Sequence, residues 1–195
     1  MSTTVIKVGG SIMRSSELGD WLSTIHSLAK NNNIIIVPGG GEFADKVREM
    51  QHSLGFDDLT AHRLAILGMS QYGYLLASMN QKFHIVEELD LLSKNLNKGT
   101  PLLWLPTELL KDSSKISASW DYTSDSIALW LATKLTADRL ILVKSKVLEH
   151  TKTSVEQCIE NGILDTGFQM LKDKFYGKIN LINKEHHQKL IDFFK

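Results

Sequence analysis

Twice within its first 54 residues, the chain passes from a short apolar segment through consecutive glycines into a segment with helical periodicity. The segment 4–8 leads into Gly9 and Gly10, and the segment 34–37 leads into three further glycines after one proline. A strand, a glycine turn and a helix repeated in this order are typical of parallel strands joined by crossover helices. The sequence therefore predicts an α/β fold with a mostly parallel sheet and a ligand at the carboxyl ends of its strands.

Periodicity and turn signals predict the elements of the rest of the chain. The segment 91–97 fits neither a helix nor a strand clearly. The chain shows no internal repeat, low-complexity tract or flexible linker, which predicts a single domain of 195 residues. The predicted helices are 15–29, 42–54, 58–79, 123–136, 154–160, 168–175 and 183–194, and the predicted later strands are 83–86, 101–105, 139–143 and 178–182.

Composition argues against several classes of function. The 22 Lys and Arg residues balance the 22 Asp and Glu residues, so bulk charge gives no support for a nucleic-acid or anionic-membrane partner. No apolar run is long enough to span a bilayer, and the N-terminus shows no secretory signal. The single cysteine, Cys158, cannot form an internal disulfide and is expected to be a half-buried helix residue, which fits a reducing cytoplasm.

The first glycine turn has the chemistry of a phosphate site. Lys7 lies in an otherwise apolar strand, where an unpaired buried charge is costly, so its ammonium group is expected to reach toward a negative group. Gly9 and Gly10 allow close approach of backbone amides, and Ser11 adds a hydroxyl. An ordinary strand with a snorkelling lysine explains this segment equally well when it is taken alone.

The second glycine turn strengthens the phosphate interpretation. Gly39, Gly40 and Gly41 stand directly before a predicted helix, whose N-terminal amides would form an anion site. Two such turns on successive parallel strands would face one crevice. The chain contains neither a Walker-type Gly-x-x-x-x-Gly-Lys-Ser/Thr segment nor a Gly-x-Gly-x-x-Gly dinucleotide fingerprint, and it has no Gly-x-Ser-x-Gly nucleophile elbow.

Two carboxylates and a lysine are further candidates for the site. Asp121 precedes a predicted helix, and Asp125 four residues later shares its face if the helix begins early enough. The two carboxylates could hold lysines or share a magnesium ion, or form a plain helix cap. Lys144 and Ser145 follow the strand 139–143, where a lysine suits either a phosphate or a solvated loop.

The seven histidines show no metal-ligand spacing, so no protein-bound metal site is predicted.

Three motifs occur in the order and approximate spacing of the amino acid kinase family, which the chain resembles over nearly its whole length. They are residues 7–11 (Lys-Val-Gly-Gly-Ser), 38–41 (Pro-Gly-Gly-Gly) and 121–128 (Asp-Tyr-Thr-Ser-Asp-Ser-Ile-Ala). The family includes acetylglutamate, aspartate, glutamate, uridylate and carbamate kinases. The chain is short for this family, and its segment 57–73 is similar to the small kinases of methanofuran- and tetrahydromethanopterin-linked one-carbon pathways in archaea and methylotrophic bacteria.

The resemblance implies a three-layer α/β/α sandwich, with the acceptor in a lobe of residues 1–115 and ATP in a lobe of residues 116–195. It implies that Lys7 bridges the phosphates, that Asp125 orients the lysines, and that Mg²⁺ accompanies ATP. By the same resemblance, the nucleotide phosphates would contact Gly9, Gly10, Ser11, Lys144 and Ser145, and the acceptor would contact Gly39–Gly41 and Asp121.

The sequence departs from the family pattern in two places. The segment 144–148 (Lys-Ser-Lys-Val-Leu) stands where many members have Thr-Asp-Val-Asp-Gly-Val beside the nucleotide. The segment from Gly167 to Lys172 places a lysine one position later than the Gly-Met-x-x-Lys segment that supplies a second catalytic lysine in many members. Lys172 is therefore the candidate for that role, with Lys144 as the alternative.

The resulting prediction is an ATP- and Mg²⁺-dependent kinase that acts on a small phosphorylated or carboxylated acceptor. The preferred acceptor is the aminomethylfuran methyl phosphate of methanofuran synthesis. We expect a cytoplasmic protein and, from the resemblance, a homo-oligomer. The altered segment 144–148 motivates an alternative, a non-catalytic nucleotide or small-molecule sensor on the same fold. A third interpretation is an assembly subunit with Trp21, Trp104 and Trp130 as interface anchors, although core packing explains each of them.

Overall fold

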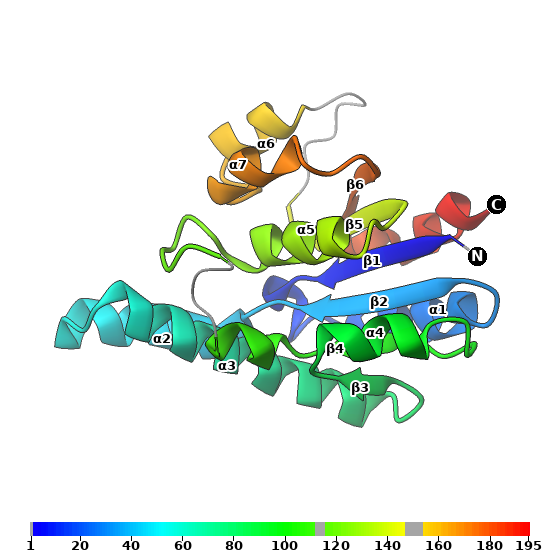
Figure 1. The fold of residues 1–195 in the computed structure, drawn as a ribbon, viewed down its shortest axis with the longest axis horizontal. Helices are drawn as coiled ribbons and strands as arrows, with labels where there is room; N and C mark the ends of the chain where they lie inside the picture. The colour runs from blue at the N-terminus through cyan, green and yellow to red at the C-terminus, as the bar shows by residue number, and fades with distance from the viewer. Residues whose placement is uncertain (1, 112–115, 147–153) are drawn as a thin grey trace.

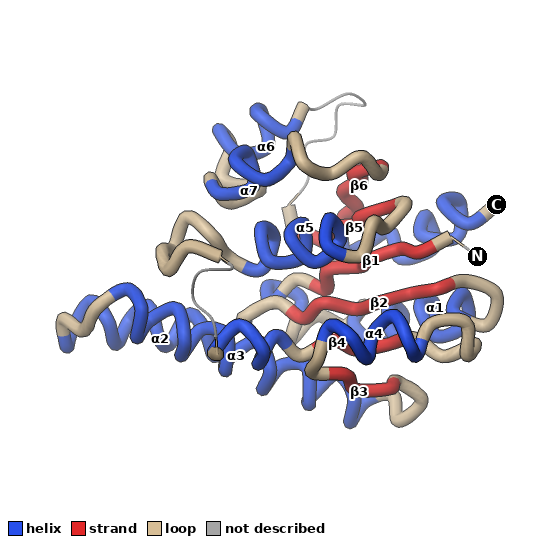
Figure 2. Tube along the Cα trace, in the orientation of Figure 1, coloured by secondary structure: helices blue, strands red, loops and turns tan. Residues whose placement is uncertain are grey.

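The structure, a computed structural model, describes residues 2–111, 116–146 and 154–195. Its elements follow the predicted alternation of strand and helix, and Figure 2 shows them by type along the chain trace. The strands are β1 (Thr3–Val8), β2 (Asn33–Pro38), β3 (His84–Val86), β4 (Leu102–Trp104), β5 (Arg139–Lys144) and β6 (Lys178–Asn183). The α-helices are α1 (Leu18–Ala29), α2 (Gly41–Leu54), α3 (Asp58–Met79), α4 (Leu89–Asn95), α5 (Ser124–Lys134), α6 (Val155–Glu160) and α7 (Gly167–Lys172), and the 3₁₀ helices are η1 (Gly10–Ile12), η2 (Pro106–Leu110) and η3 (Lys184–Phe194).

Within the described residues, one sheet of six strands runs in the order β3-β4-β2-β1-β5-β6, and every neighbouring pair is parallel. The prediction of a mostly parallel sheet is therefore confirmed. β1 lies between β2 and β5, and its last residue, Val8, is in register with Pro38 and Val143. The two glycine turns and Lys144, the last residue of β5, therefore lie side by side at one end of the sheet.

Helices cover both faces of the sheet, because successive strand residues point to opposite sides. Val5 and Leu140 pack with buried residues of α4, α5 and α7, whereas Ile6 and Ile141 pack with buried residues of α1 and η3. Figure 1 shows α4 and α5 in front of the sheet and α1 behind it. The predicted three-layer α/β/α sandwich is confirmed.

Three tryptophans belong to this core. Trp21 and Trp104 are fully buried, and Trp130 is nearly so. The rings of Trp104 and Trp130 stack with their centroids 6.2 Å apart. The interpretation of these residues as interface anchors is wrong, because side chains turned into the core do not reach a partner.

A few elements differ from their predictions in type or burial. The segment 91–97, which fitted neither pattern, lies largely in α4, and the last predicted helix is the 3₁₀ helix η3, interrupted by non-helical backbone at His186. The side chain of Asn183 caps its start by accepting a hydrogen bond from the N–H of Glu185 at 3.0 Å. Cys158 is buried rather than half-buried, and burial raises the pKa of its thiol, which keeps the thiol protonated and unreactive.

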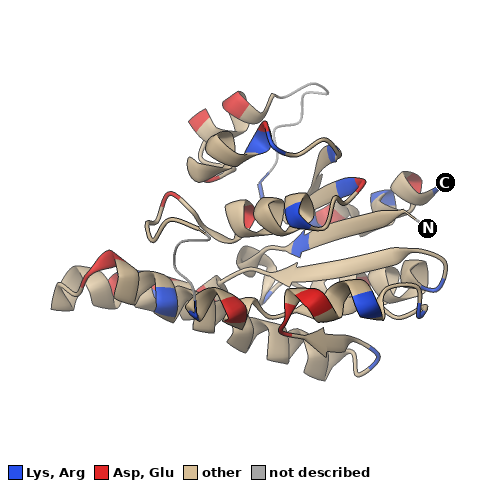
Figure 3. Cartoon of the chain, viewed as in Figure 1, with Lys and Arg blue, Asp and Glu red and all other residues tan. Residues whose placement is uncertain are grey.

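The surface carries both signs of charge. In the cartoon of Figure 3, the positions of Lys and Arg (blue) are interspersed with those of Asp and Glu (red) along the helices. Among the described residues, no helix combines the length and the apolar character that crossing a membrane requires.

Candidate active site

A cavity of about 270 Å³ opens at the carboxyl ends of β1, β2 and β5. Residues of both glycine turns line it together with Lys7, Lys144 and the first turn of α5. Its other walls come from α2, α3 and the segment before α5. The cavity therefore lies at the end of the sheet where parallel α/β folds bind their ligands.

The two glycine turns are in direct backbone contact. The N–H of Gly39 donates to the carbonyl of Val8 at 2.8 Å. A Cβ atom on Gly10 would lie 2.1 Å from the backbone nitrogen of Gly41, and Gly41 itself has a positive φ of 55°. These contacts require glycine, and they place the N-terminus of α2 at the cavity, where unpaired helical amides attract an anion.

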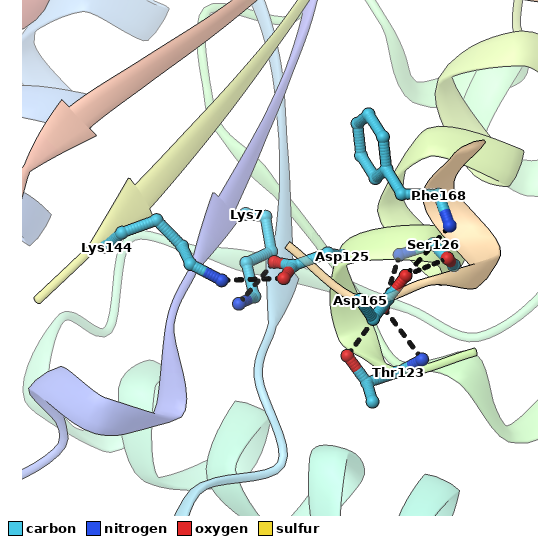
Figure 4. A network of polar contacts seen from close by, with 7 residues as sticks. All are labelled: Lys7, Thr123, Asp125, Ser126, Lys144, Asp165 and Phe168. Carbon is cyan, nitrogen blue, oxygen red and sulfur yellow. Dashed lines mark hydrogen bonds and ion pairs between the residues drawn. The ribbon is translucent and has the colours of Figure 1, made fainter. Parts of the chain in front are cut away.

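Two lysines converge on Asp125 (Figure 4). Nζ of Lys7 lies 2.8 Å from Oδ1 of Asp125, and Nζ of Lys144 lies 2.6 Å from Oδ2. The three side chains come from β1, the last residue of β5 and the first turn of α5. Lys7 and Asp125 are only 5% and 3% exposed, so the aspartate fixes both ammonium groups at the cavity wall.

Burial dominates the electrostatics of this cluster. It lowers the pKa of Lys7 from its ordinary value, an effect that Asp125 opposes and Lys144 reinforces. Burial alone would raise the pKa of Asp125, but the charges of Lys7 and Lys144 outweigh it and leave that pKa lowered. Because two ammonium groups share one carboxylate, the cluster offers positive charge to an anion such as a polyphosphate.

Asp165, just before α7, is a buried acid that no sequence motif indicated. Its carboxylate accepts hydrogen bonds from the N–H and the hydroxyl of Thr123 at 2.8 and 2.6 Å, from the N–H and the hydroxyl of Ser126, and from the N–H of Phe168 at 3.0 Å (Figure 4). Burial and the charge of Asp125 raise the pKa of Asp165. A lone aspartate gives no periodic or motif signal, because these contacts form only in the folded chain.

Asp121 lies outside the cavity wall and does not share a helical face with Asp125, because the helix does not begin early enough to include Asp121. The helix α5 begins at Ser124, and the backbone of its N-cap residue is extended, so Asp121 precedes the helix. Its carboxylate accepts hydrogen bonds from the hydroxyls of Ser119 and Thr166, each at 2.8 Å. Asp121 thereby ties the segment before α5 to the start of α7.

The other predicted residues divide between the cavity and its surroundings. Gly9 and Gly39 sit behind the lining glycines, and a Cβ atom on Gly39 would lie 2.3 Å from the backbone nitrogen of Gly10. Ser145 is exposed beyond the end of β5. Lys172, on α7, forms an ion pair with Glu156 of α6 and lies outside the cavity wall. In the segment 144–148, positions 147 and 148 lie outside the described residues.

A further wall holds residues that no motif predicted. The indole N–H of Trp120 donates to Oε1 of Gln51 at 2.6 Å, and the guanidinium of Arg48 lies 4.3 Å from the centroid of the Trp120 ring. Gln51 in turn donates to a carboxylate oxygen of Asp58 at 2.8 Å. His62 is buried, and burial lowers the pKa of its imidazole. This wall presents an aromatic ring, a cation and a carboxylate to a small polar molecule.

Comparison with known proteins agrees with this geometry. A model of the amino acid kinase family matches residues 2–146. A [5-(aminomethyl)furan-3-yl]methyl phosphate kinase of Methanocaldococcus jannaschii is 26% identical over 204 aligned positions, which cover 98% of this chain and 92% of that relative.

Solved structures place the chain in the same group of folds. Uridylate kinase from Archaeoglobus fulgidus superimposes with a TM-score of 0.70 at 18% identity, covering 98% of this chain and 96% of the other. Isopentenyl phosphate kinase of T. acidophilum, in a product complex, gives a TM-score of 0.58 at 13% identity, covering 98% and 95%. The expectation of a small-molecule kinase is confirmed, and the chain belongs to the amino acid kinase family.

Proposed function

We propose that the chain transfers the γ-phosphoryl group of ATP to the phosphate of an aminomethylfuran methyl phosphate, or of a close chemical relative, in the synthesis of a methanofuran-type cofactor. An acceptor phosphate oxygen forms the new bond to the γ-phosphorus, the bond from that phosphorus to the β,γ-bridging oxygen breaks, and ADP leaves. The similarity to the M. jannaschii kinase along nearly its whole length supports this acceptor. The observation that carries the proposal is the pair of lysines held by one buried aspartate beside two touching glycine turns.

The chain's residues act mainly by positioning and by neutralising charge. Lys7 and Lys144 are placed to stabilise the charge on the transferred phosphoryl group, and Asp125 keeps them in place. The amides at the start of α2, beside Gly40 and Gly41, suit the phosphate oxygens. The acceptor phosphate already carries negative oxygens at neutral pH, so no general base is required.

The second catalytic lysine is proposed to be Lys144. Lys144 lines the cavity and contacts Asp125, whereas Lys172 is engaged by Glu156 outside the cavity wall. We assign ATP to the lobe of residues 116–195 and the acceptor to the lobe of residues 1–115. The cavity wall formed by α2 and α3 supports the acceptor assignment, because it belongs to the first of these lobes.

Mg²⁺ is proposed to enter with ATP, where it neutralises phosphate charge. Asp125 is engaged by two lysines and Asp165 by five hydrogen-bond donors. Among the described residues, no group of three or more His, Cys, Asp and Glu is arranged to hold a metal ion. Because Asp125 and Asp165 are already engaged, we propose that phosphate oxygens supply most of the ligands of the Mg²⁺ ion.

We also place the reaction in the cytoplasm, where ATP is supplied.

A homo-oligomer remains part of the proposal. Phe43 and Met50 on α2, and Leu67 and Leu75 on α3, expose between a third and a half of their surface on two helices that pack together. A second copy of the chain would cover such apolar side chains. Sedimentation equilibrium measures the state: we expect a dimer or a larger assembly, and a monomer at micromolar concentration would contradict this part.

Transfer of ³²P from [γ-³²P]ATP to the acceptor tests the function directly. We expect turnover that is lost on chelation of Mg²⁺, and a fall of roughly 100-fold or more in Lys7→Ala, because a charge contact to the phosphoryl group is removed. Lys98→Ala is the matched control, since Lys98 is exposed, lies outside the cavity wall and donates from its ammonium group to the side chain of Asn95. ATP binding by calorimetry without turnover of any phosphorylated or carboxylated acceptor would favour the sensor alternative.

A further inference from the structure

Asp165 joins two parts of the chain that are far apart in sequence. It lies between α6 and α7, and four of its five hydrogen-bond donors belong to the N-terminal end of α5, on Thr123 and Ser126. The fifth donor is the N–H of Phe168 in α7. Figure 4 shows this carboxylate on one side of the first turn of α5, with Lys7 and Lys144 on the other. Asp165 therefore works as a helix cap supplied from another segment.

The set of contacts specifies a carboxylate at this position. All five partners of Asp165 donate hydrogen bonds, and an ionised carboxylate is the side chain that only accepts them. An asparagine would turn an NH₂ group toward some of these donors. Burying a negative charge close to that of Asp125 is unfavourable, and the hydrogen bonds offset only part of this cost, since the pKa of Asp165 stays raised.

The location of the donors explains what the cap achieves. Ser126 follows Asp125 directly, and Thr123 is the N-cap of the same helix. Fixing both residues sets the rotation of the first turn of α5 about the helix axis and its position along that axis. The direction of the Asp125 carboxylate depends on both. A displacement of about 1 Å at a catalytic group can change a rate by about 100-fold.

We propose that Asp165 is a positioning residue for phosphoryl transfer, which aims Asp125 at Lys7 and Lys144 and adds negative charge behind the lysine pair. Its contacts are made to Thr123, Ser126 and Phe168, so it acts through Asp125 rather than on the phosphates. This inference rests on the proposed kinase function but not on the identity of the acceptor.

The first test compares Asp165→Asn with Asp138→Asn. Asp138 is a matched control, because its carboxylate also accepts a backbone hydrogen bond, from the N–H of Thr3 at 2.7 Å, at the opposite end of β1. We expect kcat of Asp165→Asn to fall about 10- to 100-fold, with the KM values for ATP and acceptor within about 3-fold of the wild type. Asp138→Asn should keep its kcat within about 2-fold, and an equal kcat in Asp165→Asn would overturn the proposal.

The second test separates positioning from simple structural support. The charged groups facing Lys7 are Asp125 from α5, Lys144 from β5 and Asp165 from the segment before α7. Removing the negative charge of Asp165 should lower the pKa of Lys7 further, so the alkaline limb of kcat/KM should move to lower pH in Asp165→Asn and stay in place in Asp138→Asn. If Asp165→Asn has a lower melting temperature but the alkaline limb of its kcat/KM stays at the wild-type pH, Asp165 is only a structural cap and the proposal is overturned.

Two further measurements keep the test decisive. ¹³C NMR titration of reductively methylated lysines follows the pKa of Lys7 without turnover, so the effect of Asp165→Asn is measurable even if the acceptor is wrongly assigned. If Asp165→Asn does not fold, Ser126→Ala removes one donor and keeps the carboxylate. We expect that variant to lose roughly 3- to 10-fold in kcat with unchanged KM, and full activity would contradict the proposal.

Discussion

Trp120 donates its indole N–H to Gln51 at 2.6 Å and thereby links the segment before α5 to α2 beside the cavity. The same ring carries the guanidinium of Arg48 on its face. We expect Trp120→Phe to raise the KM for the acceptor about 3- to 30-fold, because it removes a hydrogen bond and weakens the cation–π contact. The KM for ATP should stay constant in steady-state kinetics, and Gln51→Ala, which keeps the ring, should reproduce part of the effect. An unchanged acceptor KM in both variants would separate this wall from acceptor binding.

The lysine pair yields the sharpest comparison between two positions. Lys144→Met removes an ammonium that lines the cavity, whereas Lys172→Met removes one that pairs with Glu156 of α6 outside the cavity wall. We expect kcat to fall roughly 100-fold or more in the first variant and to stay within about 3-fold in the second. Measuring both by the same ATP-coupled assay decides which lysine serves the reaction, and the opposite ranking would restore Lys172 as the candidate.

The contact between the glycine turns predicts a large effect from one methyl group. In Gly10→Ala the new Cβ would lie 2.1 Å from the nitrogen of Gly41, so one of the turns must shift. We expect loss of most activity and weaker ATP binding by calorimetry, because the shift displaces backbone amides at the cavity. Gly19→Ala is the control: nothing lies within 4 Å of its new Cβ, and helix α1 should gain about 0.5–1 kcal/mol. Normal activity in Gly10→Ala would show that the turns tolerate separation.

The activity should decline at alkaline pH. Burial lowers the pKa of Lys7 below its ordinary value of 10.5, and the proposed role requires the protonated ammonium. As pH rises through this lowered pKa, Lys7 loses its charge, so kcat/KM should fall at a pH below 10.5. Whatever activity Lys7→Arg retains should lack this limb, because a guanidinium stays charged throughout the range. If Lys7→Arg shows the same alkaline decline of kcat/KM at the same pH, that decline belongs to the titration of a different group.

Local sequence patterns were sufficient to predict a mostly parallel sheet with crossover helices and two glycine turns at the ends of its strands, whereas the three-layer arrangement was predicted from the resemblance to the amino acid kinase family. Each glycine turn follows an apolar strand, and the parallel register of β1 with β2 and β5 then brings Gly10, Gly41 and Lys144 together. Because the carboxyl ends of parallel strands meet at one edge of a sheet, the sequence pattern is sufficient to indicate these residues.

The missed and misplaced residues depend on contacts between distant segments. Spacing put Asp121 and Asp125 one helical turn apart, but the extended backbone at Thr123 starts the helix later and leaves Asp121 outside it. Asp165 acquires its meaning only when the segment before α7 packs on α5. The choice between Lys144 and Lys172 likewise depends on which ammonium the fold turns inward, and sequence offsets do not contain that information.

The central place of β1 in the sheet also bears on how the chain is made. One edge of β1 pairs with β2 soon after synthesis, but the other edge must wait for β5, which leaves the ribosome only after most of the chain. Until then an apolar strand edge is open to pairing with other chains. We therefore expect the nascent chain to be most prone to aggregation before β5 is made, and Lys7 to gain its partner Asp125 only once α5 has been synthesised.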